Sequence, residues 1–183
     1  MLIAALAVIA STLFGIYNSA NQVTRQIEAM FYDGVYLADR GFTEPGINSH
    51  LENSADAVLG IVTVTEYFPE LAQKTESLRS ARRALLDAGS IAQKGSAALE
   101  MRAGFLELMA AADDVGLTAH DWETLAHHSR TFTGAFTAIS GSGYNEAAAE
   151  RLAEQSAILR LISTFLSADT PDFFNILPAR QTF

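Results

Sequence analysis

The chain has 183 residues and no cysteine, and its 21 acidic and 12 basic residues give a formal net charge of −9. The lack of cysteine excludes disulfides, thiolate metal sites and a cysteine nucleophile. The acidic balance argues against nucleic-acid binding, because that affinity comes mainly from phosphates neutralised by lysine and arginine. A chain of this length typically forms one domain with a core of its own.

Residues 1–17 are almost wholly apolar, and no charged residue occurs before Arg25. Continued to Ala20, a helix over this stretch approaches the length that crosses a hydrocarbon core of about 30 Å. The stretch lacks the basic start and the cleavage site of a signal peptide, while a buried helix of a soluble domain stays open as an alternative. The sequence therefore predicts a single-pass membrane anchor over residues 2–20, and Arg25 behind it favours a cytoplasmic body.

Beyond the anchor, apolar residues recur at spacings of three and four, which is the pattern of amphipathic helices. The β-branched run 61–65 resembles a strand, but the helical period reaches it from upstream. The expected helices cover about residues 18–40, 47–68, 71–112, 118–139 and 144–166. The prediction is all-α: a long antiparallel four-helix bundle without a sheet, carried by an N-terminal membrane-anchor helix. Residues 1–20 form the anchor and residues 21–183 form the bundle domain.

The tail that follows Pro171 is unusually apolar for a chain terminus. It contains Phe173, Phe174, Ile176 and Leu177, which would form a sticky patch if they were exposed. We therefore expect the tail to fold back across one end of the bundle and to bury one of the two phenylalanines. The alternative is a free tail that binds a partner.

Several short motifs occur in a characteristic order. Tyr17-Asn18 follows the apolar segment, Asp33–Arg40 reads DGVYLADR, Pro45 and Asn48 precede an amphipathic helix, and Tyr144 opens the late run YNEA. In these motifs the chain resembles the LemA family, and its closing FFNILPARQTF is faintly similar to the tail of that family. The resemblance implies a single N-terminal membrane segment that carries a long antiparallel helical bundle, and it implies no catalytic residue.

One helical face presents three residues that are able to bind a metal. His120, Glu123 and His127 are spaced by three and four positions, and imidazole and carboxylate are natural ligands of zinc and iron. Ser129 lies close by for a serine–histidine pair. However, the sequence shows no second ligand cluster, and His50 is far away along the chain. Polar residues on the exposed face of a helix produce the same pattern, so no metal site is predicted.

Two other features have ordinary structural explanations. Gly141–Gly143 contains a serine between glycines, but it lacks the strand–turn–helix context of a hydrolase nucleophile. The pairs Phe132/Phe136 and Phe173/Phe174 are typical of a hydrophobic core rather than of a ligand pocket. We therefore expect neither a catalytic residue nor a cofactor.

Arg79, Arg82 and Arg83 form a short basic face in an otherwise acidic chain. Such a face is able to meet anionic lipid or an acidic partner. Pairing with Glu76 and Asp87 at helical spacing is the favoured interpretation.

These observations predict a non-enzymatic scaffold that is anchored in the cell membrane and presents a helical face to another envelope or membrane protein. The alternative hypothesis is a helical metal-binding protein or metalloenzyme that uses His120, Glu123 and His127. No nucleic-acid partner is expected.

Overall fold

The computed structural model describes residues 15, 18, 21–37, 41–142 and 144–154. The predicted anchor over residues 2–20 lies almost wholly outside this part of the chain, and the predicted docked tail over residues 171–183 lies wholly outside it. Both therefore stay predictions. Within the described residues, no helix is both long enough and apolar enough to cross a membrane.

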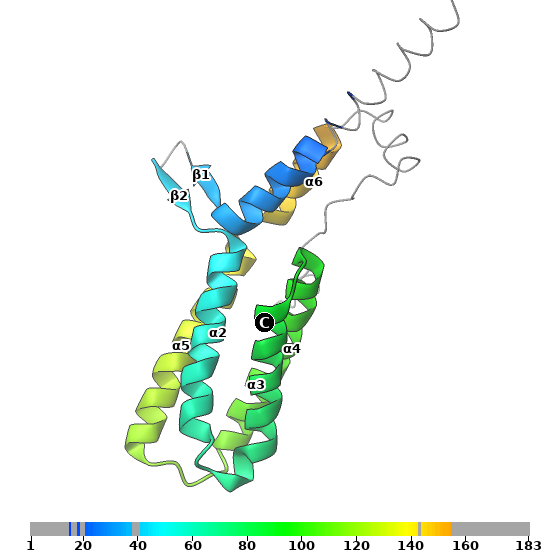
Figure 1. Ribbon diagram of the computed structural model, residues 1–183. Coiled ribbons are helices and arrows are strands. Elements are labelled where there is room, and N and C mark those ends of the chain that lie inside the picture. Colours follow the sequence, from blue (N-terminus) through cyan, green and yellow to red (C-terminus); the bar gives the residue numbers. More distant parts are fainter. Residues whose placement is uncertain (1–14, 16–17, 19–20, 38–40, 143, 155–183) are drawn as a thin grey trace, which may run out of the picture.

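The described chain is mostly helical, and its helices pack together. A first helix covers residues 21–33. The α-helices that follow are α2 (Ile47–Thr65), α3 (Ala72–Asp87), α4 (Ile91–Ala112), α5 (Ala119–Gly141) and α6 (Tyr144–Glu154). Figure 1 shows α2 to α5 side by side with alternating direction, and α2 packs on both α5 and α3 while α3 packs on α4. The β-branched run 61–65 is helical, as predicted, because it completes α2.

The prediction that the chain contains no sheet is wrong. Residues expected to end the first helix and form a turn instead form an antiparallel hairpin of β1 (Val35–Leu37) and β2 (Phe42–Glu44). The helix ends at residue 33 because Gly34 has a φ of +91°, a conformation that favours glycine. Valine, tyrosine, phenylalanine and threonine in the two strands have the β-branched or aromatic side chains that sheets favour.

The predicted single helix over residues 71–112 is also wrong, because the chain turns at Ala88–Ser90. The 3-10 turn η1 (Pro69–Leu71) leads into α3, which ends at Asp87. Ser90 then caps α4, since its side chain accepts a hydrogen bond from the Gln93 backbone N–H over 3.2 Å. The result is two antiparallel helices with a small, polar turn between them.

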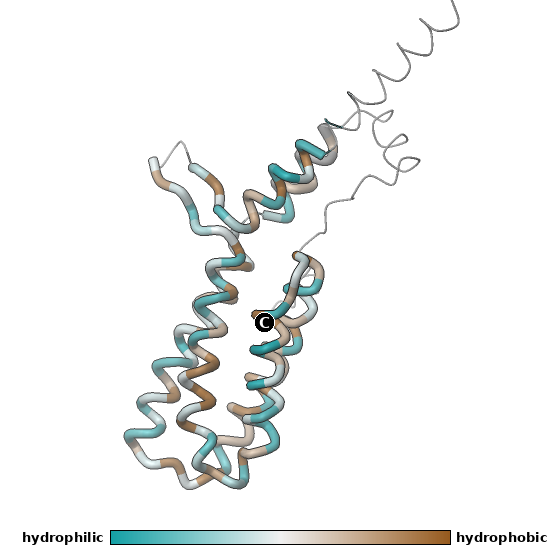
Figure 2. Tube along the Cα trace, viewed as in Figure 1, coloured by the Kyte–Doolittle hydropathy of each residue, from teal (hydrophilic) through white to brown (hydrophobic). Residues whose placement is uncertain are grey.

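Helix α2 lies at the centre of the core. Figure 2 shows an apolar stretch along its lower half, where α3 and α5 flank it. The buried Thr65 and Thr75 join α2 to α3 through a hydroxyl hydrogen bond of 3.0 Å. The largest fully buried side chains are Phe31, Phe132, Ile27, Leu51, Ile61, Leu71, Leu78, Leu85, Met101, Leu108 and Leu125.

The first helix and α6 form a second, smaller pair above the bundle of α2 to α5, beside the hairpin (Figure 1). The buried ring of Phe31 meets the ring of Tyr144 edge-on, with 5.8 Å between their centroids. Gly46 passes so close to the end of the first helix that an added Cβ would overlap the Phe31 carbonyl. The sequence left open whether residues 140–143 form a loop or a weak point in a continuous helix. Helix α5 continues to Gly141, and α6 begins as a separate helix at Tyr144.

Candidate functional site

The three metal candidates lie on the outer surface of α5. His120, Glu123 and His127 are all exposed, and His120 and His127 are two helical turns, about 10.5 Å, apart along the axis. In the part of the chain that the structure describes, no three histidine, aspartate, glutamate or cysteine side chains gather closely enough to hold a metal ion. A metal centre on this face would need ligands from another element.

The serines considered for hydrolysis direct their protons elsewhere. The Ser129 hydroxyl donates to the Met109 sulfur over 3.4 Å. The Ser142 hydroxyl donates to the Ile139 carbonyl over 2.9 Å, at the end of α5. In neither arrangement does the hydroxyl donate to a general base, which is the usual way in which a serine nucleophile is activated.

The basic face of α3 is largely occupied by contacts within the protein. Arg79 forms ion pairs of 2.7 Å with Glu76 and 2.8 Å with a glutamate of the α2–α3 turn. Arg82 donates from Nε to the Ala55 carbonyl on α2 over 2.7 Å. Pairing with Glu76 is therefore confirmed, whereas the predicted pairing with Asp87 has no counterpart among the described residues. Arg79 and Arg82 therefore tie α3 to α2. Arg83 is exposed and forms no ion pair among the described residues.

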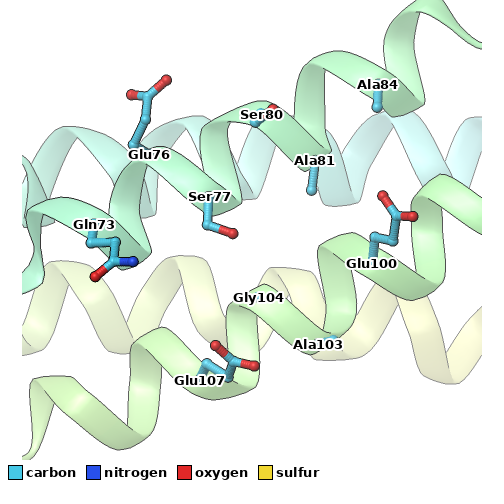
Figure 3. Close-up of a pocket in the computed structure, with 10 residues that line it drawn as sticks. All are labelled: Gln73, Glu76, Ser77, Ser80, Ala81, Ala84, Glu100, Ala103, Gly104 and Glu107. Atoms are coloured by element: carbon cyan, nitrogen blue, oxygen red, sulfur yellow. The ribbon is translucent and has the colours of Figure 1, made fainter.

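A shallow groove of about 830 Å³ lies between α3 and α4. Figure 3 shows this groove with α3 and α4 in front and α2 and α5 behind them. Ser77 and Ala81 of α3 point toward α4. Ala103 and Gly104 line the α4 side. A Cβ at Gly104 would lie 3.7 Å from Leu78, an ordinary contact. Small side chains therefore form the floor of the groove.

Carboxylates border this groove. Glu100 and Glu107 rise from α4 toward α3 (Figure 3). Glu107 lies 3.7 Å from Lys74, but both side chains are well exposed and such a pair contributes little. Glu100 has no ion pair among the described residues. The groove therefore combines a floor of small side chains with a rim of negative charge.

A second hollow of about 480 Å³ continues the groove toward the α3–α4 turn. It shares Ala84 and Glu100 with the first and adds Asp87 to the acidic rim. From Gln73 to Asp87 the combined groove follows about 21 Å of α3. This length matches about four turns of a helix laid along it.

The aromatic residues of α4 and α5 form part of the core, as predicted. Phe132 and Phe136 are 1% and 7% exposed. Phe132 stacks on Phe105 with 4.2 Å between the ring centroids and tilts against Phe136 at 4.8 Å. These rings join α4 to α5, and they also form one wall of a small hollow of about 260 Å³.

The start of α5 holds an aspartate, Asp121, whose pKa is lowered by hydrogen bonds. The Asp121 carboxylate accepts hydrogen bonds from the Thr118 hydroxyl over 2.6 Å and from the Thr118 backbone N–H over 3.1 Å. The hydroxyl bond, followed by the backbone bond, lowers the pKa of Asp121 below its ordinary 3.8. Together with the bond from the Asp121 backbone N–H to the Thr118 hydroxyl, these contacts form a capping box at the start of α5.

Because the folded pKa of Asp121 is depressed, its contribution to stability is present above the unfolded pKa and is lost as the pH falls through the folded value. We expect Asp121→Asn to lower the melting temperature near neutral pH and to have progressively less effect below about pH 4. Thermal melts of both proteins across this range measure the difference. A difference that stays constant with pH would show that the charge of Asp121 plays no part.

The sequence analysis did not predict the groove between α3 and α4, although the residues that line it recur at helical spacing. Ser77, Ala81 and Ala84 recur at spacings of four and three, as do Glu100, Gly104 and Glu107.

In searches of protein-family models, curated proteins and solved structures, no match to this chain was found.

Proposed function

We propose that this chain is a non-enzymatic helical scaffold, anchored in a membrane by residues 2–20, that binds a helical segment of another membrane protein in the groove between α3 and α4. The groove itself supports the proposal best, because it is about 21 Å long, floored by small side chains and bordered by carboxylates. An elongated groove of this kind is able to receive one face of a helix. The resemblance to the LemA family implies the same layout of anchor and bundle.

The chemistry of the groove favours a basic partner helix. Small side chains such as Ala103 and Ser77 let a helix backbone approach closely, as small residues do at helix–helix interfaces. Lysine or arginine side chains on the partner would then reach Glu100 and Glu107 at the rim. These exposed charges steer association and fix register more than they add affinity. Binding should therefore weaken as the salt concentration rises.

Filling the groove tests this proposal. Ala103 is exposed on the groove floor, so Ala103→Phe should fold normally while it occupies the space of the partner helix. Ala126→Phe, at an exposed position on α5, is the matched control. We expect proteins that co-purify with the wild-type chain from source membranes to be retained by the control and reduced at least about tenfold by Ala103→Phe, equivalent to about 1.4 kcal/mol. Equal recovery with both variants would contradict the proposed site.

Two further measurements separate this function from its alternatives. The intact chain should sediment with membranes and resist carbonate extraction, whereas a chain lacking residues 1–20 should be soluble. Recovery of the intact chain in the soluble fraction would remove the anchor from the proposal. Stoichiometric zinc or iron in protein purified without a histidine tag, lost on His127→Ala, would replace the scaffold with the metal-binding alternative.

A further inference from the structure

The hollow between α4 and α5 has the character of a binding site for an aromatic side chain. It measures about 260 Å³. Apolar residues line one part of it, and polar residues line the rest: Phe105, Leu106, Phe132 and Phe136, and Arg102, Thr133, Thr137 and Ser140. Leu106 is 57% exposed at its edge, so apolar surface faces solvent there. A phenyl ring placed in this hollow would cover that surface and extend the stack of aromatic rings.

Arg102 places a positive charge at the same hollow. It is half-buried, and its guanidinium carbon lies 5.9 Å from the centre of the Phe136 ring. Among the described residues it has no ion pair with a carboxylate, although acidic residues outnumber basic ones in this chain. A partly desolvated guanidinium favours a carboxylate, which it can bind through two parallel hydrogen bonds. The hollow therefore fits an acidic group that stands next to an aromatic ring.

The chain itself contains that combination. Asp172 directly precedes Phe173 and Phe174, in the tail that lies outside the described residues. The chain is also long enough for this segment to return to the hollow. Ser140 lines the hollow and lies four residues before α6, which adds about 15 Å up to Glu154. Residues 155–171 span about 55 Å when extended and about 25 Å as a helix.

We propose that the segment Asp172–Phe174 docks in the hollow between α4 and α5 of the same molecule. The Asp172 carboxylate pairs with Arg102, and one of the two phenylalanine rings packs against Phe136 and Leu106. This docking closes the seam between α4 and α5, and it leaves the groove between α3 and α4 free. It is independent of the scaffold function, because it concerns a different face of the bundle.

Engineered cysteines test the docking without interference, because the natural chain has none. Thr137 lines the hollow, and Thr131 is an exposed control on the same helix. Two double variants of the full chain are made: Thr137→Cys with Asn175→Cys, and Thr131→Cys with Asn175→Cys. Position 175 lies next to the docking segment, so Asp172, Phe173 and Phe174 stay unchanged. Under mild oxidation we expect an intramolecular disulfide with Thr137→Cys at a rate at least about tenfold above that with Thr131→Cys.

The outcomes separate the possible occupants. A fast disulfide within one chain at residue 137, slowed several-fold by Arg102→Gln, is the result that the proposal requires. Disulfide-linked dimers at residue 137 would show that a second copy fills the hollow and would overturn docking within one molecule. Equal rates at residues 137 and 131 would show that the tail does not occupy the hollow.

A charge exchange checks the ion pair by a separate measurement. Asp172→Arg and Arg102→Asp should each lower the melting temperature by about 2–4 °C, and the double variant should recover most of the loss. Asp172→Arg changes no residue of the bundle, so its effect is not a defect of core packing. A double variant whose loss equals the sum of the two single losses would contradict the pairing.

Discussion

Replacing Phe132 with alanine is expected to lower the free energy of unfolding by about 3–5 kcal/mol. Phe132 is 1% exposed and lies between Phe105 and Phe136, at centroid distances of 4.2 and 4.8 Å. Its ring therefore carries much of the contact between α4 and α5. Removing it costs the transfer free energy of the ring and leaves a cavity that merges with the neighbouring hollow.

Urea denaturation of wild type, Phe132→Ala and Phe132→Leu measures this effect. The leucine variant keeps most of the apolar volume and should lose about half as much or less. A loss below about 1 kcal/mol for alanine would mean that the aromatic stack is not a principal contact between α4 and α5. Because small domains are stable by only about 5–15 kcal/mol, the alanine variant should also be measured at low temperature.

Gly34→Ala should be the most damaging change outside the helical core. Gly34 has a φ of +91°, and a Cβ there would overlap the carbonyl of Glu44 in β2. The backbone conformation alone costs a non-glycine residue about 1–3 kcal/mol. The overlap adds to this cost, because neither backbone segment is able to move without breaking the hairpin. We expect a total loss above about 3 kcal/mol, measured by urea denaturation.

Gly41→Ala is the matched control for this prediction. Gly41 also has a positive φ, of +69°, but an added Cβ would meet nothing within 4 Å. Gly41→Ala should therefore lower the free energy of unfolding only by the cost of a positive φ at alanine, about 1 kcal/mol. Similar losses at both glycines would contradict the close approach of Gly34 to β2.

The helical part of the fold was predictable from the sequence because amphipathic spacing is a local signal. The period that runs through residues 47–65 outweighed the β-branched character of its last residues, as it does in α2. The burial of Phe132 and Phe136 followed from the same pattern. These properties depend on neighbours within two helical turns.

The errors arose where structure depends on distant contacts or on a single capping residue. In the hairpin, the backbone of residues 44–46 passes so close to Gly34 that there is no room for a side chain at this position. No local sequence pattern shows this contact. The turn between α3 and α4 needs only Ser90 as a cap after Gly89, and the long apolar period on both sides of it concealed this signal.

The candidate site could be predicted even less well. Ser77 and Ala81 on one helix and Glu100 and Gly104 on another have no evident connection until α3 and α4 are placed side by side. The prominent signal, His120 with Glu123 and His127, led instead to an exposed face without a gathered metal site among the described residues. Histidines and carboxylates at helical spacing are readily noticed in a sequence, whereas the spacing of the small residues that form the groove gains meaning only when α3 and α4 are placed side by side.

The most direct test of the scaffold proposal is photo-cross-linking in intact source cells. A photoreactive amino acid is placed at Ala103, on the groove floor, or at Ala126, on the outer face of α5; both positions are exposed. We expect residue 103 to cross-link to a membrane protein through a basic helical segment, with Glu100→Lys weakening the product and residue 126 giving none. The same products from both positions, or no product from residue 103, would contradict the proposal that the groove binds a partner helix.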